Sequence, residues 1–309
     1  MSAAASWLTE GWKRFGSSGS NAVRFCDGPV SGLRWSADFL GGWVWLTQWQ
    51  TARTHELGDS DFKAWSDAVK QALPRAQGAV LQSRPFKGAP PHPTVLFGTE
   101  PASGVEVSEN LGNAQLRAIV RFGAVSHPGI FLDHAPLRRW IFEHSRGERV
   151  MNTFAYTGLL GVAAGLGGAT EVVNADLSKK TLLWADENTA LNGVSGVVHS
   201  FAGDTMRDLK IRSKKGERFG GVILDPPSFS RSKTSVFSTD KDLGVLHELA
   251  LSCVRDGGWL STSINSVSIG HRQFESHRVG VRLEHLLDIE SPEPFPRNQV
   301  KGWVFRVKR

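Results

Sequence analysis

The sequence contains little cysteine, with Cys26 and Cys253 as its two thiols among 309 residues. Two cysteines provide neither a disulfide framework nor a cysteine-rich zinc site, and they favour a reducing compartment. The ten histidines show no metal-binding spacing of the H-E-x-x-H type. We therefore assign no metal site from the sequence.

The sequence also lacks any apolar run long enough to span a membrane. Residues 1–13 do not contain the uninterrupted apolar core of a secretory signal peptide. We therefore expect a cytoplasmic protein without a membrane partner. Internal repeats and low-complexity tracts are absent as well, and a hydrophobic content of 40% is ordinary for a globular protein with a sizeable core.

Basic residues outnumber acidic ones, since 36 Lys and Arg stand against 30 Asp and Glu and leave a formal net charge of +6, with a pI near 9.5. This surplus suits a polyanionic partner, although many enzymes of small molecules share it. A chain of this length is expected to hold two domains. We place them at 1–125 and 126–309.

The predicted N-terminal domain is rich in tryptophan and of α+β type. Seven of the eleven tryptophans lie in it, namely Trp7, Trp12, Trp35, Trp43, Trp45, Trp49 and Trp65. Trp43, Trp45 and Trp49 would share one face of a strand. Burial of this face against a helix is favoured over a platform for stacking bases. The pattern also predicts a helix at 59–73 and strands at 78–82, 95–98, 104–108 and 114–122.

The predicted C-terminal domain alternates strands and helices. A helix with Asp133 as N-cap and Pro136 in its first turn is expected to run to Ser145. Strands are then predicted at 149–154, 170–175, 196–202, 219–224, 257–264, 281–289 and 301–308, with helices at 158–166, 178–192, 204–211, 240–254 and 271–278. The alternation predicts a parallel α/β sheet that binds ligands at the carboxyl ends of its strands.

The turn Phe154–Gly158 joins the first strand to a helix and ends in glycine, which lets a ligand approach backbone N–H groups. The absence of G-x-G-x-x-G in this turn counts against NAD or FAD. Asp176 ends the next strand, where a carboxylate can bind a ribose diol. Asp176 as a helix cap is the alternative, and the spacing favours the ribose.

Two later carboxylates follow strands in the same way. Asp204 suits a hydrogen bond to an adenine amino group and helix capping equally well. Asp225 precedes Pro226 and Pro227, so it is held extended at a strand tip, while the prolines leave their carbonyls free to accept hydrogen bonds. With the ring of Phe229, this segment can hold a planar amide-like or heteroaromatic group, and a rigid loop without a ligand is the alternative.

In combination these residues resemble a family. Residues 152–158, 167–180, 184–193 and 224–233 look like the bacterial S-adenosylmethionine-dependent methyltransferases of large-subunit ribosomal RNA. The likeness extends back to Phe131-Leu-Asp-His and forward through Asp256-Gly-Gly-Trp-Leu, so it covers roughly residues 100–309. Ala135 departs from the pattern, because relatives often carry Arg there, and this puts one contact near the cofactor tail in doubt.

The resemblance implies a Rossmann-like class I methyltransferase with a seven-stranded, mostly parallel sheet. It implies S-adenosylmethionine as cofactor and a target base near Pro226–Phe229. The cofactor contacts that it implies are Phe131, Asp133, Asn152, Phe154, Ala155, Tyr156, Thr157, Gly158, Asp176, Leu177, Ser178, Asn192, Asp204 and Asp225. The N-terminal hundred residues match much less clearly, and the oligomeric state stays open.

The resemblance includes a cytosine-C5 branch and a guanine-nitrogen branch, which differ in chemistry. Methylation of cytosine C5 needs a nucleophile, normally Cys, that attacks C6. Asn265 stands where cytosine-type relatives carry Cys, and neither cysteine of this chain suits the role. Guanine N7 has an in-plane lone pair and requires only positioning. We therefore expect a guanine-nitrogen enzyme, with Asp225, Pro226, Pro227, Phe229 and Asn265 as the catalytic set.

Basic residues beside the Pro-Pro segment, Arg231 and Lys233, are expected to neutralise phosphates that flank the target base. A second basic group, Arg297, Lys301 and Arg306, lies near the C-terminus. The cluster of Lys210, Arg212, Lys214, Lys215 and Arg218 is interpreted as a solvated loop, and His134 as a structural hydrogen-bonding group. Three alternatives remain: a cytosine-C5 enzyme, a methyltransferase of a small molecule or protein, and a nucleotide-binding module without catalysis.

Overall fold

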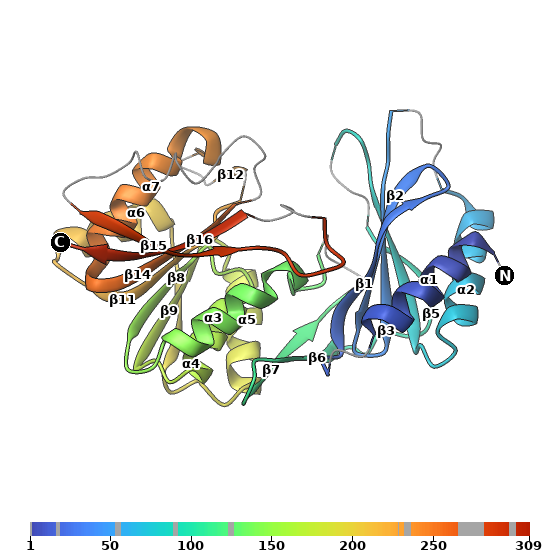
Figure 1. Cartoon of the computed structure of the whole chain (residues 1–309), viewed down its shortest axis with the longest axis horizontal. Coiled ribbons are helices and arrows are strands. Elements are labelled where there is room, and N and C mark those ends of the chain that lie inside the picture. The colour runs from blue at the N-terminus through green and yellow to red at the C-terminus, as the bar shows by residue number, and fades with distance from the viewer. Residues whose placement is uncertain are drawn as a thin grey trace. The chain divides into compact units, whose positions relative to one another are not determined.

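The computed structural model describes residues 2–16, 19–52, 57–88, 92–122, 127–227, 229–231, 236–264, 281–296 and 301–309, with only the backbone described at 229–231, 236–240 and 301. The chain divides into two compact units (Figure 1). The first comprises Met1–Leu132 and Glu293–Pro296, and the second comprises Asp133–Pro292 and Arg297–Arg309.

The first unit is built on a five-stranded sheet with strand order β1-β2-β3-β4-β5. The strands of this sheet are β1 (Ala22–Val30), β2 (Leu33–Leu40), β3 (Trp43–Trp49), β4 (Gly78–Arg84) and β5 (Thr94–Phe97). The unit also contains the helices α1 (Ala3–Phe15) and α2 (Asp59–Ala72). A separate antiparallel pair is formed by β6 (Val105–Asn110) and β7 (Gln115–Val120). All neighbouring pairs of the sheet are antiparallel except β3 and β4, which run parallel with α2 as their crossover helix.

Both faces of β3 are buried, and the tryptophans lie on the face away from the helices. Val44 and Leu46 belong to the core that includes residues of α1 and α2. Trp43 and Trp45, which are 2% and 3% exposed, instead lie with their ring centroids 5.1 and 5.9 Å from that of Phe122. The expected burial of Trp43 and Trp45 is correct, but a helix as their cover is wrong. Rings this deeply buried cannot stack on bases.

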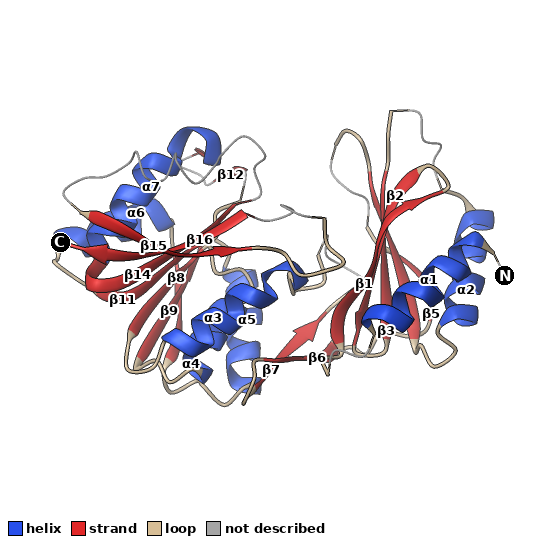
Figure 2. Cartoon of the chain, in the orientation of Figure 1, coloured by secondary structure: helices blue, strands red, loops and turns tan. Residues whose placement is uncertain are grey.

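The second unit contains the seven-stranded sheet that the sequence predicts, with order β10-β9-β8-β11-β14-β16-β15 (Figure 2). A 3-10 helix (Leu132–His134) leads into its elements: α3 (Ala135–His144), β8 (Arg149–Thr153), α4 (Leu159–Leu166), β9 (Glu171–Asp176), α5 (Lys179–Leu191), β10 (Val198–Ala202), α6 (Thr205–Lys214), β11 (Phe219–Leu224), β12 (Phe229–Arg231), β13 (Val236–Ser238), α7 (Thr239–Cys253), β14 (Val254–Ile264), β15 (Arg282–Ile289) and β16 (Lys301–Lys308). The first five strands of the sheet order run parallel, and β16 is antiparallel to both of its neighbours.

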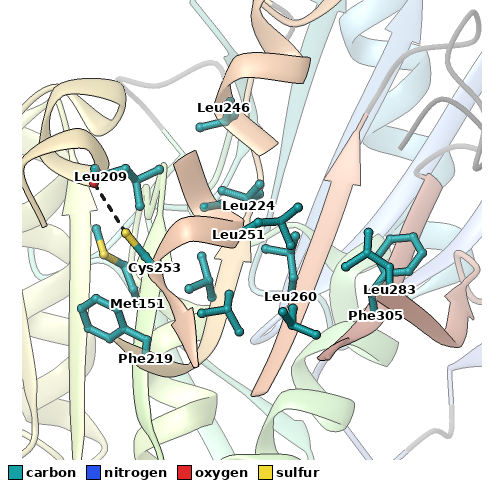
Figure 3. Close-up of a cluster of buried hydrophobic side chains, with 14 of the residues drawn as sticks. Met151, Leu209, Phe219, Leu224, Leu246, Leu251, Cys253, Leu260, Leu283 and Phe305 are labelled. Atoms are coloured by element: carbon teal, nitrogen blue, oxygen red, sulfur yellow. Dashed lines mark hydrogen bonds between the residues drawn. The ribbon is translucent and has the colours of Figure 1, made fainter. Parts of the chain in front are cut away.

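Helices cover both faces of this sheet: α3, α4 and α5 lie on one side, and α6 and α7 on the other (Figure 1). All six residues of the central strand β11 are buried, as expected for a parallel strand covered on both faces. The core beneath α7 joins Leu246, Leu251 and Cys253 to Leu224 and Leu260 of the sheet (Figure 3).

The element bounds differ from the prediction in a few places. Helix α6 continues to Lys214, so Lys210, Arg212 and Lys214 are helical and not part of a loop. The short hairpin of β12 and β13 follows the Pro-Pro segment and was not expected from the sequence. The predicted helix at 271–278 lies outside the described residues.

Two buried amides on the face of the sheet that α4 covers constrain the sequence of that helix. Asn152 on β8 donates from Nδ2 to Oδ1 of Asn174 on β9 at 2.9 Å, and both side chains are fully buried. Glycine at position 161 of α4 makes room for this pair, because a Cβ there would lie 2.0 Å from Asn174 Oδ1. Packing alone therefore requires glycine at this position.

We expect Gly161→Ala to lower the free energy of unfolding by about 1–3 kcal/mol, because the methyl group would displace Asn174 in a close-packed layer. Urea unfolding followed by circular dichroism measures this loss. Gly196→Ala is the matched control, since a Cβ at Gly196 meets nothing within 4 Å. Equal stability of the two variants would contradict the packing requirement at Gly161.

Candidate active site

The carboxyl ends of four parallel strands meet at one edge of the seven-stranded sheet. The register pairs Thr153 of β8 with Ala175 of β9 and with Leu224 of β11, and it pairs Ala202 of β10 with Asp176. The turns after these strands therefore lie side by side. They contain most of the predicted site residues, namely Phe154–Gly158, Asp176–Ser178, Asp204 and Asp225–Pro227.

The first of these turns has an unusual backbone. Phe154, Tyr156 and Gly158 all adopt positive φ angles, of 53°, 51° and 74°. For a residue with a Cβ the left-handed conformation costs roughly 1–2 kcal/mol, and such residues gather at functional sites. Gly158 has a packing reason as well, because a Cβ there would lie 2.7 Å from Asn174 Nδ2 and 2.8 Å from Ala185 Cβ.

Three hydrogen bonds from outside hold this strained turn. Ala155 N donates to Ala175 O at 3.0 Å, which continues the pairing of the two strands by one residue. Asn188 on α5 donates from Nδ2 to the carbonyl oxygen of Thr157 at 2.9 Å. The third bond runs from Tyr156 N to Oδ2 of Asp176 at 2.9 Å. The conformation is thus imposed by the neighbouring strand and helix.

Asp176 connects two turns through one carboxylate. While Oδ2 accepts from Tyr156 N, Oδ1 accepts from Ser178 N at 2.8 Å. The N-cap of α5 is Ser178, whose hydroxyl oxygen accepts from Thr181 N at 3.2 Å, so capping is not the role of Asp176. Oδ1 also accepts a long hydrogen bond of 3.5 Å from Thr181 Oγ1, so Oδ2, which has two lone pairs and accepts from Tyr156 N, is the oxygen that could accept a further bond from a diol. Leu177, 44% exposed, offers an apolar surface beside it.

The remaining cofactor candidates occupy different environments. Asp204 caps α6, because its Oδ1 accepts from Arg207 N at 2.9 Å. Asn192 is the C-cap of α5 and donates to Asn188 O, so by 1.5 Å per residue it lies about 20 Å along the helix from Ser178. The structure therefore does not bring Asn192 to the shared edge.

Asn152, a further candidate, does not present its side chain to this edge. Asn152 is fully buried beneath the first turn and supports it through Asn174, as described above. Phe131 belongs to the first unit, where its ring centroid lies 5.0 Å from that of His127.

Asp225 directly follows β11, with its side chain 25% exposed. Its Oδ1 accepts a hydrogen bond of 2.6 Å from the Ser263 hydroxyl of β14 and lies 3.3 Å from Nε2 of His134. Pro226 is buried and Pro227 exposed. Of the other predicted catalytic residues, Phe229 lies in β12 with only its backbone described, and Asn265 lies outside the described residues.

His134 lies between two carboxylates in the interior. Its side chain is 8% exposed, and its Nδ1 is 3.3 Å from Asp133 Oδ1 on the side away from Asp225. Burial by itself lowers the pKa of this imidazole, but the charge of Asp225 and the hydrogen bonds to both carboxylates raise it to about 10. The raised pKa favours the imidazolium form, whose Nε2 lies within ion-pair distance of Asp225 Oδ1.

Sequence reasoning missed Ser263 and the ionic role of His134. The signal for Ser263 is three consecutive hydroxyl residues, 261–263, in a strand that is otherwise apolar toward its end. For His134 the sequence shows only an adjacent Asp133. The contact with Asp225 spans 91 positions in the chain and arises from the tertiary fold alone.

Neither thiol is placed as a nucleophile. Cys253 is fully buried in the core beneath α7, with Sγ 3.5 Å from the carbonyl oxygen of Leu209 (Figure 3). Burial raises its pKa. Cys26 is buried in the first unit, and burial together with the nearby Asp38 raises its pKa to about 12. Thiolate, the reactive form, is thus disfavoured at both positions.

No helix among the described residues is long and apolar enough to cross a membrane. The described part of the chain also contains no group of three or more His, Cys, Asp or Glu residues that could hold a metal ion.

The fold and the carboxylate-bearing edge define a class I methyltransferase. The family model for S-adenosylmethionine-dependent methyltransferases matches residues 33–303, and the chain belongs to this family. The chain is therefore an enzyme whose methyl donor is S-adenosylmethionine.

The chain is similar to curated proteins that are named ribosomal RNA large subunit methyltransferases. Ribosomal RNA large subunit methyltransferase K/L of Alcanivorax borkumensis is 38% identical over 58% of this chain and 25% of its own length. The protein of the same name from Chromohalobacter salexigens is 31% identical over 80% of this chain and 34% of its own length. Ribosomal RNA large subunit methyltransferase I of Aeromonas hydrophila is 35% identical over 54% of this chain and 42% of its own length. The chain thus spans less than half the length of each of these relatives.

Solved structures agree on the fold. The crystal structure of SMU.776, a candidate methyltransferase complexed with SAH, superposes with a TM-score of 0.82 at 22% identity and covers 98% of this chain and 80% of that one. The tRNA m1G37 methyltransferase of M. jannaschii covers 88% of this chain and 74% of that one, with a TM-score of 0.56 at 16% identity.

The residues at the edge fit a nucleoside-bearing cofactor. Asp176 offers spare acceptor capacity at the tip of β9, as a ribose diol requires, and the exposed Leu177 offers an apolar surface to a heteroaromatic ring. The strained turn that they adjoin is held in place before any ligand binds. The donor set of this edge therefore agrees with the family's cofactor.

We expect Asp176→Ala to raise the Kd for S-adenosylmethionine at least about tenfold, since two backbone N–H groups lose a charged acceptor and the strained turn loses a restraint. Isothermal titration calorimetry measures Kd. Asp186→Ala, which removes an exposed acid on α5 that accepts from Ser200, is the control and should leave Kd unchanged. A wild-type Kd for Asp176→Ala would exclude this site.

Asp204→Ser separates cofactor contact from helix capping, because serine keeps an N-cap acceptor but removes the carboxylate. We expect the variant to unfold like the wild type and to bind S-adenosylmethionine several-fold more weakly in the same calorimetric titration. An unchanged Kd would assign Asp204 to capping α6 alone.

Proposed function

We propose that the enzyme methylates a ring nitrogen of guanine, at N7, in large-subunit ribosomal RNA. The similarity to curated ribosomal RNA large subunit methyltransferases supports RNA as the substrate, and the net charge of +6 suits a polyanion. One observation supports the choice of a nitrogen atom. The site contains the anchored carboxylate of Asp225, whereas both thiols of the chain are buried in hydrophobic cores.

On the cofactor side, we assign the predicted residues by their positions. Asp176 binds the ribose hydroxyls, Leu177 and Asp204 face the adenine, and the turn Phe154–Gly158 forms the floor beneath the cofactor. Asn152 supports that turn from below, the backbone groups of Ala155 and Thr157 anchor it to Ala175 and Asn188, and Ser178 begins the adjoining helix. When bound, S-adenosylmethionine supplies an electrophilic methyl group.

On the base side, Asp225 receives the N–H donors of guanine. A carboxylate is an acceptor-only group, which suits the adjacent N1–H and 2-amino donors of guanine. Guanine N7 carries an in-plane lone pair on the opposite edge of the base and attacks a methyl group directly, so no covalent adduct with the protein is needed. The backbone at Pro226 and Pro227 would complete the slot for the base, while the ring of Phe229 and Asn265 stay predictions from the sequence.

The cytosine-C5 alternative requires a nucleophile that attacks C6 of the base. Burial raises the pKa of both thiols, and Cys253 packs in the core beneath α7. These observations disfavour a covalent mechanism and support direct transfer to nitrogen.

We expect Cys26→Ala and Cys253→Ala to keep kcat within about twofold of the wild type, with a stability loss of about 1 kcal/mol for each buried side chain. Methyl transfer from labelled S-adenosylmethionine to ribosomal RNA measures kcat. RNA containing 5-fluorocytidine should form no covalent complex with the wild-type protein. Loss of activity in either variant together with a trapped complex would establish the cytosine mechanism.

We expect Asp225→Ala to fold and to lower methyl transfer at least about 100-fold, because the base loses its charged acceptor. Asp288→Ala is the matched control, since Asp288 pairs with the exposed His285 on β15, and it should transfer methyl groups at the wild-type rate. A normal rate for Asp225→Ala would remove the base-binding site from this position.

The substrate itself is tested by mass mapping of modified nucleosides in ribosomal RNA from cells with and without this protein. We expect one 7-methylguanosine to disappear from large-subunit RNA without it, and the purified enzyme to restore it. Its RNA affinity should fall steeply as salt rises, since phosphate contacts release counterions. A modified cytosine in its place, or turnover insensitive to salt, would contradict the proposal.

A further inference from the structure

Four side chains from three separate segments meet at the base of the Asp225 loop. Asp133 and His134 belong to the 3-10 helix before α3, Asp225 follows β11, and Ser263 lies on β14. Three contacts link them in a row. Asp133 Oδ1 lies 3.3 Å from His134 Nδ1, and His134 Nε2 lies 3.3 Å from Asp225 Oδ1. The Ser263 hydroxyl then donates to the same Asp225 Oδ1 at 2.6 Å. His134 and Ser263 are both buried.

The two partners of Asp225 bind the same carboxylate oxygen. His134 Nε2 and the Ser263 hydroxyl both approach Oδ1, and they come from different elements of the fold. Within the described residues no hydrogen bond or ion pair to Oδ2 is found, and the side chain is 25% exposed. The carboxylate therefore has one anchored oxygen on its protein side and one oxygen available to a ligand.

Stability does not explain such a network well. Burying an imidazolium and its partners costs desolvation energy that the ion pairs only partly offset, and apolar residues of equal volume often serve stability better. What the network does provide is direction: Asp133 fixes the tilt of the imidazole, and the imidazole with Ser263 fixes the plane of the Asp225 carboxylate. The same logic of a group oriented by a second-layer partner recurs at catalytic and metal sites.

We propose that His134 is a positioning residue, oriented by Asp133, which together with Ser263 anchors Asp225 Oδ1 so that Oδ2 points at the N–H donors of the target base. The inference rests on the proposed function, because it assigns a base-recognition role to Asp225. It adds that base selectivity depends on two residues that do not touch the base.

The test uses the full-length enzyme and RNA that carries the mapped target nucleotide as guanine, as hypoxanthine (which lacks the 2-amino group) or as 2-aminopurine (which lacks N1–H). Wild-type enzyme should reject at least one analogue strongly, because an unpaired acceptor is then left in the site. His134→Gln and Ser263→Ala should each lower kcat on guanine at least about tenfold and shrink the preference for guanine over that analogue at least about fivefold.

A merely structural role predicts a different result, because a general loosening of the fold would lower the rates on guanine and on both analogues by the same factor. The Kd for S-adenosylmethionine should stay within about twofold in both variants, which shows that the folded site is intact. His285→Gln, at an exposed His–Asp pair on β15, is the control and should change neither rate nor preference. If His134→Gln does not fold, Ser263→Ala alone tests the anchoring of Oδ1, since it leaves the buried charge in place.

The pH dependence of stability provides a second measurement. The pKa of His134 is raised from its ordinary 6.5 to about 10, so its stabilising contribution is fully present below about pH 6.5 and is lost as pH rises through 10. The groups that face it are Asp133, Asp225 and, through Asp225, Ser263. The difference in unfolding free energy between wild type and His134→Gln should therefore shrink as pH rises from 7 to 10.

The outcomes separate this inference from the proposed function. If Asp225→Ala is inactive while His134→Gln and Ser263→Ala keep wild-type rates and preference, the positioning role is overturned and the function stands. If Asp225→Ala keeps the wild-type rate, the base-binding site proposed here is overturned and the positioning role with it. A loss of rate without a change in preference also overturns the positioning role.

Discussion

The parallel register of β8 with β9 and β11 is the constraint on which the site depends. Because Thr153 pairs with both Ala175 and Leu224, the strands end level with one another, and three turns that are far apart in the chain become neighbours. Parallel strands have no tight turn between them, so each connection must pass through a helix on a face of the sheet. The loops at the carboxyl edge therefore lead from a strand into a helix and need not form tight turns between paired strands, so they can carry polar groups.

Carboxylates that satisfy donors of the fold are the recurring device at this edge. Asp176 accepts from Tyr156 N and Ser178 N, and Asp225 accepts from Ser263 and contacts His134. In both cases the protein uses part of the acceptor capacity of the group and leaves the rest for a ligand. This arrangement orients the charge before the ligand arrives, so less ordering entropy is lost on binding.

The sequence predicted much of this architecture because its signals are local. Period-two and continuous apolar runs located all seven strands of the large sheet, and the Asp-Pro-Pro segment located the tip of β11. The failures are equally physical. Trp43 and Trp45 were expected beneath a helix, but the choice of covering element depends on where β7 and the following Phe122 fold back, and no local pattern records that. Asn192 was assigned to the site by motif, although it ends the helix that Ser178 begins.

The amino-acid sequence by itself determined the fold class, the family and the identity of the carboxylates at the strand tips, since these follow from periodicity and from short motifs. Only the tertiary structure decided how those carboxylates are held. Asp176 bridges two turns and is not a helix cap, both thiols are buried in cores, and the pKa of His134 is raised because Asp225 and Asp133 flank it. Charge state and orientation depend on groups brought together across 20 to 130 residues, for which a sequence contains no local signal.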